Sequence, residues 1–313
     1  MVHAIRIRSL AATVAAALTL VLAAAPSSDA AFPGVPGPII YAKSGNFGES
    51  GGLFIHGPKQ RQRPQRLTSD PGDHDPSYSA DGRMIVFAGD RDGNASPGNH
   101  IYVARRGGGQ VRELTSGGFD SNPSFSPNGR QVVFDRRAAQ ATRIFIVNID
   151  GGGLRQLTTG SGDENPTFSP SGRQIAFASN RGRRGGIYTV RPSGAGLREL
   201  IDSPISDSDP DYSPNGRRIA FTSGTNIFTA RANGTHARKL THSRHSCFDG
   251  ACYEAPSFAP DGKHIAYLTE GRFNSDIEVM RADGTNVKGF ADGGVNPDGD
   301  GTLLGAPAWG PKP

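Results

Sequence analysis

Beyond its first thirty residues, the 313-residue sequence lacks long hydrophobic runs, helical periodicity and blocks of one charge. The single long apolar run, residues 11–25, is shorter than the roughly twenty residues that a membrane-spanning helix needs. No stretch of the later sequence shows apolar residues at helical spacing over ten residues. The formal charge of +5 is mild, and no basic run is interleaved with aromatic residues. These absences argue against a helical fold, a membrane span and a nucleic-acid partner.

The early apolar run belongs to a targeting segment. Arg6 and Arg8 precede the run, and the small-residue stretch Ser27–Ala31 follows it. This is the arrangement of a secretory signal peptide. We expect residues 1–30 to form the signal peptide and residues 31–313 to form an exported domain, with an uncleaved anchor as the alternative.

Cysteine is scarce: Cys247 and Cys252 are the only two, and they lie close together in the sequence. In an exported chain this pair predicts a disulfide rather than a redox or metal site. A bridge that closes so short a loop contributes about 2 kcal/mol in the chain-entropy model. The predicted disulfide therefore shapes its loop more than it stabilises the domain.

Six copies of one pattern recur through the chain at intervals of 43 to 51 residues. A period of that length is typical of solenoids, propellers and arrays. The copies read DPSYSADGR from Asp75, NPSFSPNGR from Asn122, NPTFSPSGR from Asn165, DPDYSPNGR from Asp209, APSFAPDGK from Ala255 and APAWGPKP from Ala306.

Each full copy contains four short apolar stretches separated by turn residues. In the second copy these are Pro123–Ser126, Gln131–Asp135, Arg143–Val147 and Leu154–Thr158. Their β-branched and aromatic residues suit strands that are buried on both faces. In the Ser-Pro-Asn-Gly turn after the first stretch, proline presets a type I turn and glycine takes the left-handed position. Four antiparallel strands in about 45 residues predict one propeller blade.

The two ends of the chain supply the parts of a further blade. Ile39–Ala42, Gly52–His56 and Gln65–Thr68 match strands two, three and four, and Ala306–Gly310 supplies strand one. Closing the ring in this way removes exposed sheet edges. We therefore predict an all-β, six-bladed β-propeller, with its ring closed by a blade shared between the N- and C-terminal strands.

The repeat also carries a family resemblance. The run P-x-[FY]-S-P-[DN]-G-[RK]-x-[IV]-x-F, then IY or IF, then RxLT, resembles the WD-like repeat of the TolB propeller family over nearly the whole chain after residue 38. The resemblance implies a bacterial envelope protein, so we expect a periplasmic or secreted location. We expect no counterpart of the α/β domain that precedes the propeller in that family. Its partner, the peptidoglycan-associated lipoprotein, is therefore only an analogy, because one fold hosts many functions.

Binding residues are expected on one face of the propeller. The connections from strand two to three, and from strand four to the next blade, share that face and differ in length and sequence. Such irregular loops on a rigid scaffold commonly carry function. The longest are Lys43–Gly51, Gly89–Asn99, Arg136–Thr142, Ser179–Gly185, Thr269–Ser275 and Asp292–Gly305.

Polar residues precede the first strand of each blade on this face. Three residues before the repeat proline stand Asp73, Asp120, Asp163 and Asp207; one residue before it stand Asp75, Asn122, Asn165 and Asp209; the fifth full copy offers Glu254. We expect these side chains to ring the mouth of the channel, where they would attract a cation or a basic partner segment.

A structural role for the same residues is the alternative. Aspartate and asparagine before a strand often cap turns. The nearby loops also carry arginines that could pair with the aspartates between blades, namely Arg91, Arg136, Arg137, Arg181, Arg183, Arg184 and Arg272.

No complete catalytic or metal-binding motif is present. Gly48–Gly52 fits the G-x-S-x-G pattern but lies between two predicted strands, where a nucleophile elbow does not occur. His242 and His245 beside Cys247 lack a third ligand, while Asp90–Asn94 and Asp298–Gly301 lack the closing glutamate of a calcium loop. We therefore predict no catalytic residue, no metal ligand and no bound cofactor. A divalent cation such as calcium in the channel stays open as an alternative.

The sequence favours an exported, non-catalytic propeller that binds a protein or peptide of the cell envelope. The alternative is a metal-dependent lyase or hydrolase acting on a carbohydrate or lactone, because related-looking propellers carry such activities. A third reading is the non-catalytic propeller of a peptidase-like architecture, acting in trans.

Overall fold

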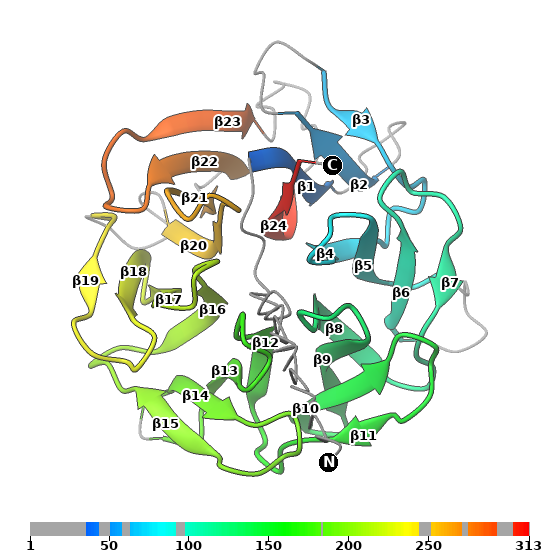
Figure 1. Cartoon of the computed structure of the whole chain (residues 1–313), viewed down its shortest axis with the longest axis horizontal. Coiled ribbons are helices and arrows are strands. Elements are labelled where there is room, and N and C mark those ends of the chain that lie inside the picture. Colours follow the sequence, from blue (N-terminus) through cyan, green and yellow to red (C-terminus); the bar gives the residue numbers. More distant parts are fainter. Residues whose placement is uncertain are drawn as a thin grey trace, which may run out of the picture.

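The computed structural model describes residues 36–43, 51–57, 63–91, 98–182, 184–243, 252–270, 275–292 and 303–312. These residues form six four-stranded antiparallel sheets arranged in a ring (Figure 1). The predicted six-bladed β-propeller is thereby confirmed. Within these ranges there is no helix, and so none long and apolar enough to cross a membrane.

Five blades are built from consecutive strands, with the first strand nearest the ring axis and the fourth at the rim (Figure 1). The second blade contains β4 (His74–Tyr78), β5 (Met84–Gly89), β6 (His100–Arg105) and β7 (Arg112–Glu113), and the third contains β8 (Phe119–Phe125), β9 (Gln131–Ala138), β10 (Ala141–Asn148) and β11 (Arg155–Gln156). The fourth contains β12 (Asp163–Phe168), β13 (Ile175–Ser179), β14 (Gly186–Val190) and β15 (Arg198–Ile201). The fifth contains β16 (Asp207–Tyr212), β17 (Arg218–Ser223), β18 (Asn226–Arg231) and β19 (Arg238–Lys239), and the sixth contains β20 (Cys252–Phe258), β21 (His264–Glu270), β22 (Ser275–Arg281) and β23 (Lys288–Asp292).

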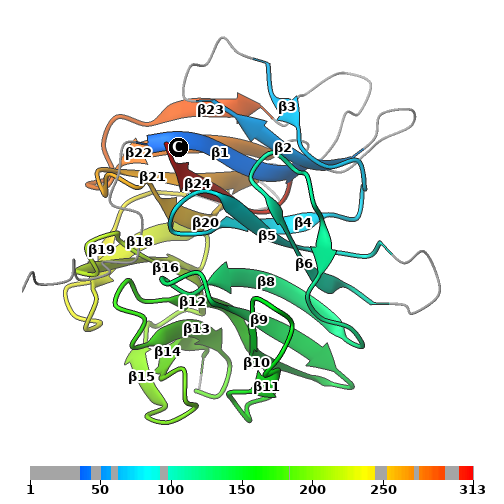
Figure 2. The ribbon, with the colours of Figure 1, turned by 45° about the vertical axis from the view of Figure 1, so that its right-hand side comes forward.

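The first blade joins segments from both ends of the sequence. It contains β24 (Leu303–Pro311), β1 (Pro36–Lys43), β2 (Gly52–His56) and β3 (Gln65–Arg66), in that order. Ala308 on β24 pairs with Ile40 on β1, and Trp309 Nε1 donates to the Gly37 carbonyl at 3.0 Å. β24 lies between β4 and β20 of the flanking blades (Figure 2). The predicted shared blade is confirmed, and it closes the ring.

The hydrophobic core lies between neighbouring blades. In one cluster, Val86 and Val103 of the second blade pack with Phe125 and Phe134 of the third. Both faces of a blade are covered in this way, which explains why its middle strands are almost continuously apolar. The packed blades give a rigid base to the connections at either face.

The short turns gather on one face, which we call the turn face. Arg106, in the turn between strands three and four, donates its backbone N–H to the carbonyl of Arg83, in the turn between strands one and two, at 2.9 Å. Ile149 and Arg130 make the same bond in the third blade at 2.8 Å. The opposite face, where the first strand of each blade begins, is called the mouth face.

One expected loop is wrong. Arg136–Thr142 is not an irregular connection, because β9 and β10 continue to pair as far as Ala138 opposite Ala141. A tight turn follows, with Ala139 in the left-handed region at φ 53°. The backbone of Thr142 also donates to Ser161 of the next blade at 3.0 Å, which holds the extended hairpin beyond the apolar part of the strands.

Candidate functional site

The inner strands of five blades share an irregularity at the residue before the repeat proline. Each of these residues lies in the left-handed region, with φ between 49° and 52°, and the pairing with the second strand shifts register beside it. The five residues are Asp75, Asn122, Asn165, Asp209 and Ala255. Asparagine and aspartate tolerate this conformation better than most residues. The backbone conformation therefore explains why four of the five positions carry aspartate or asparagine. The register shift marks a β-bulge, and its extra residue changes the direction in which the neighbouring side chains point.

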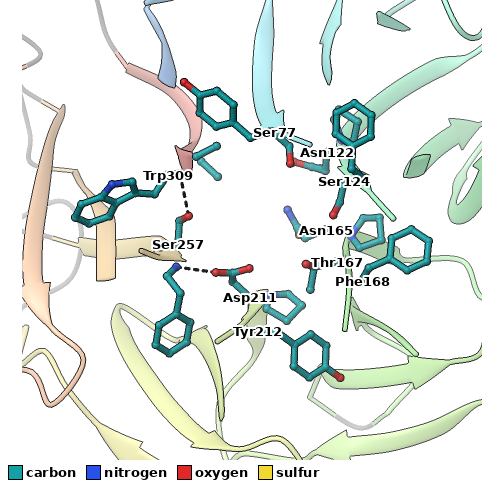
Figure 3. A pocket seen from close by; sticks show the side chains of 18 of the residues that line it. Ser77, Asn122, Ser124, Asn165, Thr167, Phe168, Asp211, Tyr212, Ser257 and Trp309 are labelled. Carbon is teal, nitrogen blue, oxygen red and sulfur yellow. Dashed lines mark hydrogen bonds between the residues drawn. The ribbon is translucent and has the colours of Figure 1, made fainter. Parts of the chain in front are cut away.

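A cavity of about 170 Å³ lies where the inner strands of all six blades converge (Figure 3). The five left-handed residues are among those that line it. Asp75, Asn122, Asn165 and Asp209 are therefore brought together, as the sequence predicted. Two of them are also linked across blades, since the Asn122 backbone N–H donates to the Asp75 side-chain Oδ2 at 3.3 Å. A cavity of this size accommodates a few water molecules or the end of a chain or side chain.

The next side chain to face the cavity lies two residues further along each inner strand. These side chains are small and mostly polar, namely Ser77, Ser124, Thr167, Asp211, Ser257 and Ala308. Sequence reasoning missed this ring, although its signal is present as the residue between the proline and the aromatic residue of each repeat. Asp211 is the only acid in the ring (Figure 3). It accepts a hydrogen bond from the Phe258 N–H at 2.7 Å, and burial raises its pKa to about 7.

Asp135, a buried acid that the sequence did not single out, supports the cavity from β9. Its Oδ2 accepts hydrogen bonds from Asn122 Nδ2 at 2.8 Å and from the Asn165 N–H at 2.9 Å. Burial raises the pKa of Asp135 to about 8, and the charges of Asp75 and Glu164 add to this rise. Asp135 therefore joins two blades at the mouth of the channel.

Two carboxyl groups of the mouth face, Asp209 and Glu254, also have raised pKa values. Burial raises the pKa of Asp209, although the hydroxyls of Ser208 and Thr222 offset part of the rise. Burial and the nearby charges of Glu270 and Asp209 raise the pKa of Glu254 to about 7. The mouth thus combines amides with several carboxyl groups that ionise with difficulty. Such an arrangement suits recognition of a cationic or hydrogen-bond-donating group.

The aspartates three residues before the proline lie elsewhere. Asp73, Asp120, Asp163 and Asp207 are all buried, and none of them lines the cavity. Asp73, Asp120 and Asp163 instead form ion pairs with Arg91, Arg136 and Arg181, respectively. The expectation that these carboxylates ring the mouth is therefore wrong. The pairing with arginine is present, but each pair lies within one blade rather than between blades.

Each of these arginines also stacks on an aromatic pair of its own blade. The Arg91 guanidinium lies 5.0 Å from the Phe87 ring and 5.3 Å from the Tyr102 ring. Arg136 and Arg181 make the corresponding contacts in the third and fourth blades. Burial raises the pKa of Asp73, and the hydrogen bond from Arg91 offsets part of the rise. The pairs fix the start of the inner strand against the second strand, which is a structural role.

Asp207 departs from this pattern. The turn between β17 and β18 has only Gly224 and Thr225 between the paired residues Ser223 and Asn226, so no arginine reaches the carboxylate. Neither oxygen of Asp207 has a hydrogen-bond partner of good geometry in the described chain. Burial raises its pKa more than the hydroxyls of Ser223 and Ser203 lower it.

Several other predicted features fall outside the described residues. They are residues 48–50 of the G-x-S-x-G segment, His245, Cys247, Arg183, Arg272, residues 92–97 and the segment from 293 to 302. His74, at the start of β4, bonds through Nδ1 with the Gly72 carbonyl at 2.8 Å. In the part of the chain that the structure covers, no three His, Cys, Asp or Glu side chains gather as metal ligands.

Comparison with known proteins agrees with the fold. A sequence model described as the TolB β-propeller domain matches residues 49–203. No curated protein matches the chain.

Solved structures with a similar fold include TolB from Acinetobacter baumannii, which shares 22% identity with a TM-score of 0.74 over 88% of this chain and 67% of that one. A TolB-like protein from Agrobacterium tumefaciens shares 18% identity with a TM-score of 0.63 over 89% of this chain and 100% of that one. Hydrazine synthase from Kuenenia stuttgartiensis shares 15% identity with a TM-score of 0.69 over 90% of this chain and 48% of that one. At such identities these likenesses establish the fold alone.

Proposed function

The chain is a TolB-type β-propeller, and we propose that it is an exported, non-catalytic scaffold that binds a protein or peptide partner of the cell envelope at the mouth of its channel. The observation that carries this proposal is the ring of Asp75, Asn122, Asn165 and Asp209 at the cavity. Its left-handed backbone is shared by successive blades, and its side chains line the space that a partner would enter.

The chemistry of the ring favours a basic, extended segment. Asp75, Asp209 and the nearby Glu254 provide carboxyl groups that a bound cation would help to ionise, and the amides of Asn122 and Asn165 provide donors and acceptors. Low-dielectric walls around charges of one sign focus the field on an approaching cation. The cavity is too small for a folded domain but admits an arginine or lysine side chain. The loops of the mouth face would contact the rest of the partner.

The deeper aspartates have an indirect part in this proposal. Asp73, Asp120 and Asp163 hold the entries of the inner strands through their arginine pairs. Replacing them would disturb the ring by loosening the blade. For this reason the binding test changes the residues before the proline instead.

The binding test is affinity capture from an envelope extract with the protein starting at residue 31. The mouth variant is Asp75→Asn/Asp209→Asn. The matched control is Asp150→Asn/Asp283→Asn, which removes two charges from exposed turns of the turn face. We expect a partner that the native protein and the control retain, that the mouth variant loses, and that added salt releases.

Two outcomes would contradict the proposal. In the first, the mouth variant retains the partner as strongly as the control variant does. In the second, the native protein and the control variant have no captured partner in common.

Export is tested separately, because the leader lies outside the described residues. A mature N-terminus near Ala30 or Ala31 in an envelope or culture fraction would support it, and an intact leader in the cytoplasm would contradict it. Nothing in the described part of the chain favours the metal-dependent lyase or hydrolase.

A further inference from the structure

The turn face carries a repeated apolar position at its rim. Six large apolar side chains are exposed in the described chain, and four of them immediately precede the fourth strand of a blade. These four are Val111, Leu154, Leu197 and Val287, with 37%, 42%, 44% and 49% of their surface exposed. They belong to the second, third, fourth and sixth blades. Exposed apolar side chains that recur around one face indicate an interaction surface more strongly than scattered ones do.

A basic residue follows each of these apolar residues. Arg112, Arg155, Arg198 and Lys288 are all exposed, and Arg238 follows the smaller Ala237 in the fifth blade. Two of the guanidinium groups reach the neighbouring blade, since Arg112 donates to the Ile149 carbonyl and Arg155 to the Pro192 carbonyl. These bonds hold the basic groups close to the face.

Further basic residues occupy the turns of the same face. The turn between strands one and two ends in a basic residue in five blades, and an arginine ends strand three or directly follows it in four. These exposed residues are Arg83, Arg130, Arg173, Arg217, Lys263, Arg105, Arg191, Arg231 and Arg281. The acids of these turns are fewer, namely Asp81, Glu113, Asp150, Glu199, Asp261 and Asp283. The turn face is therefore basic, whereas the mouth face carries Asp75, Asp209 and Glu254.

From this arrangement we infer that the turn face binds an anionic lipid surface, with the acidic mouth directed away from it. Basic residues near an anionic bilayer are attracted to its headgroups within a Debye length. The apolar side chains between them would enter the interface, as in other peripheral membrane-binding surfaces. The inference does not depend on the proposed partner at the mouth.

The apolar positions favour a lipid surface over a soluble polyanion. A polyanion requires only the arginines and lysines, and exposed leucine or valine adds nothing to its binding. A bilayer interface instead rewards apolar side chains beside basic ones. Their spread over four blades also fits a flat partner better than a groove-bound ligand.

Vesicle sedimentation tests the inference, using the mature protein and vesicles of phosphatidylcholine with or without phosphatidylglycerol. The apolar variant is Val111→Ser/Leu154→Ser/Leu197→Ser/Val287→Ser, and the charge variant is Arg83→Glu/Arg130→Glu/Arg173→Glu. All seven side chains are exposed, so both variants should keep the native melting temperature. We expect the native protein to bind the anionic vesicles only. Either variant, and added salt, should weaken this binding several-fold. Asp75→Asn/Asp209→Asn should leave vesicle binding unchanged.

A tryptophan reporter gives an independent measurement. The chain has one tryptophan, Trp309, which is buried, so Leu154→Trp adds a single exposed indole. Brominated acyl chains should quench it in anionic vesicles. The inference is overturned if the native protein ignores anionic vesicles. It is also overturned if the apolar variant binds them as well as the native protein does while inorganic polyphosphate competes fully, because the face would then be a general polyanion site.

Discussion

Arg136 and Asp120 form a buried ion pair between the first two strands of the third blade. Arg136 Nε donates to Asp120 Oδ1 at 2.5 Å, the Asp120 side chain has no exposed surface, and the guanidinium lies 5.2 Å from the Phe145 ring. Thr115 Oγ1 donates to the other carboxylate oxygen at 2.5 Å. Thr115 also binds the Ile101 backbone of the second blade, so both carboxylate oxygens and the cation are satisfied where the second and third blades meet. This pair explains why an acid that looks like a ligand in the sequence has a structural role.

Asp120→Asn should lower the free energy of unfolding by about 3–5 kcal/mol, because it leaves a largely buried guanidinium without its counter-charge. Asp207→Asn offers a matched comparison, since Asp207 is equally buried but has no arginine. We expect that change to be neutral or stabilising, because it removes a carboxyl group that burial already disfavours. Urea denaturation of both variants measures the difference, and equal losses would contradict the structural assignment.

Stability should depend on pH through Asp135. Its pKa is about 8 in the folded protein and 3.8 in the reference state, so the folded state keeps a proton that the unfolded state releases between these values. The stabilisation is thus complete below about pH 4 and is lost as the pH rises towards 8. Asp135→Asn should flatten this dependence and be more stable than the native protein at pH 8. Melting temperatures from pH 5 to pH 9 test this, and parallel curves for the two proteins would refute it.

Ala255→Asn should stabilise the protein by about 0.5–1 kcal/mol. Ala255 adopts φ 52°, the same left-handed conformation as Asn122 and Asn165, which asparagine tolerates better than alanine does. The reverse change, Asn165→Ala, should destabilise by a similar amount. Denaturant midpoints of the two variants check both signs. A loss of stability in Ala255→Asn would show that packing in the channel outweighs the backbone preference.

The disulfide stays a prediction, because Cys247 lies outside the described residues. Cys252 begins β20 and is buried. We expect the exported protein to contain no free thiol under denaturing, non-reducing conditions. Cys247→Ser/Cys252→Ser should cost only about 2 kcal/mol in the chain-entropy model. Thiol titration and denaturation measure the two quantities, and two free thiols in the native protein would disprove the bridge.

Much of the fold could be predicted because its signals are local. The proline and glycine of each Ser-Pro-Asn-Gly type turn fix a hairpin within a few residues. The β1 and β24 strands at the two ends carry matching halves of one repeat. The hairpin of β9 and β10 was missed because its outer part, Arg136–Thr142, is polar. Its pairing comes from the backbone and from Ser161 of the next blade.

The sequence by itself determined the number of blades, the closure of the ring and the residues at the start of each inner strand. Only the tertiary structure decided which of those residues face the channel. In a regular strand, Asp73 and Asp75 would point to the same side, because side chains alternate with period two. The left-handed residue at Asp75 interrupts the alternation, so Asp73 is buried against Arg91 and Asp75 lines the cavity. A backbone bulge and a partner eighteen residues away made that choice, and neither can be read from the repeat pattern alone.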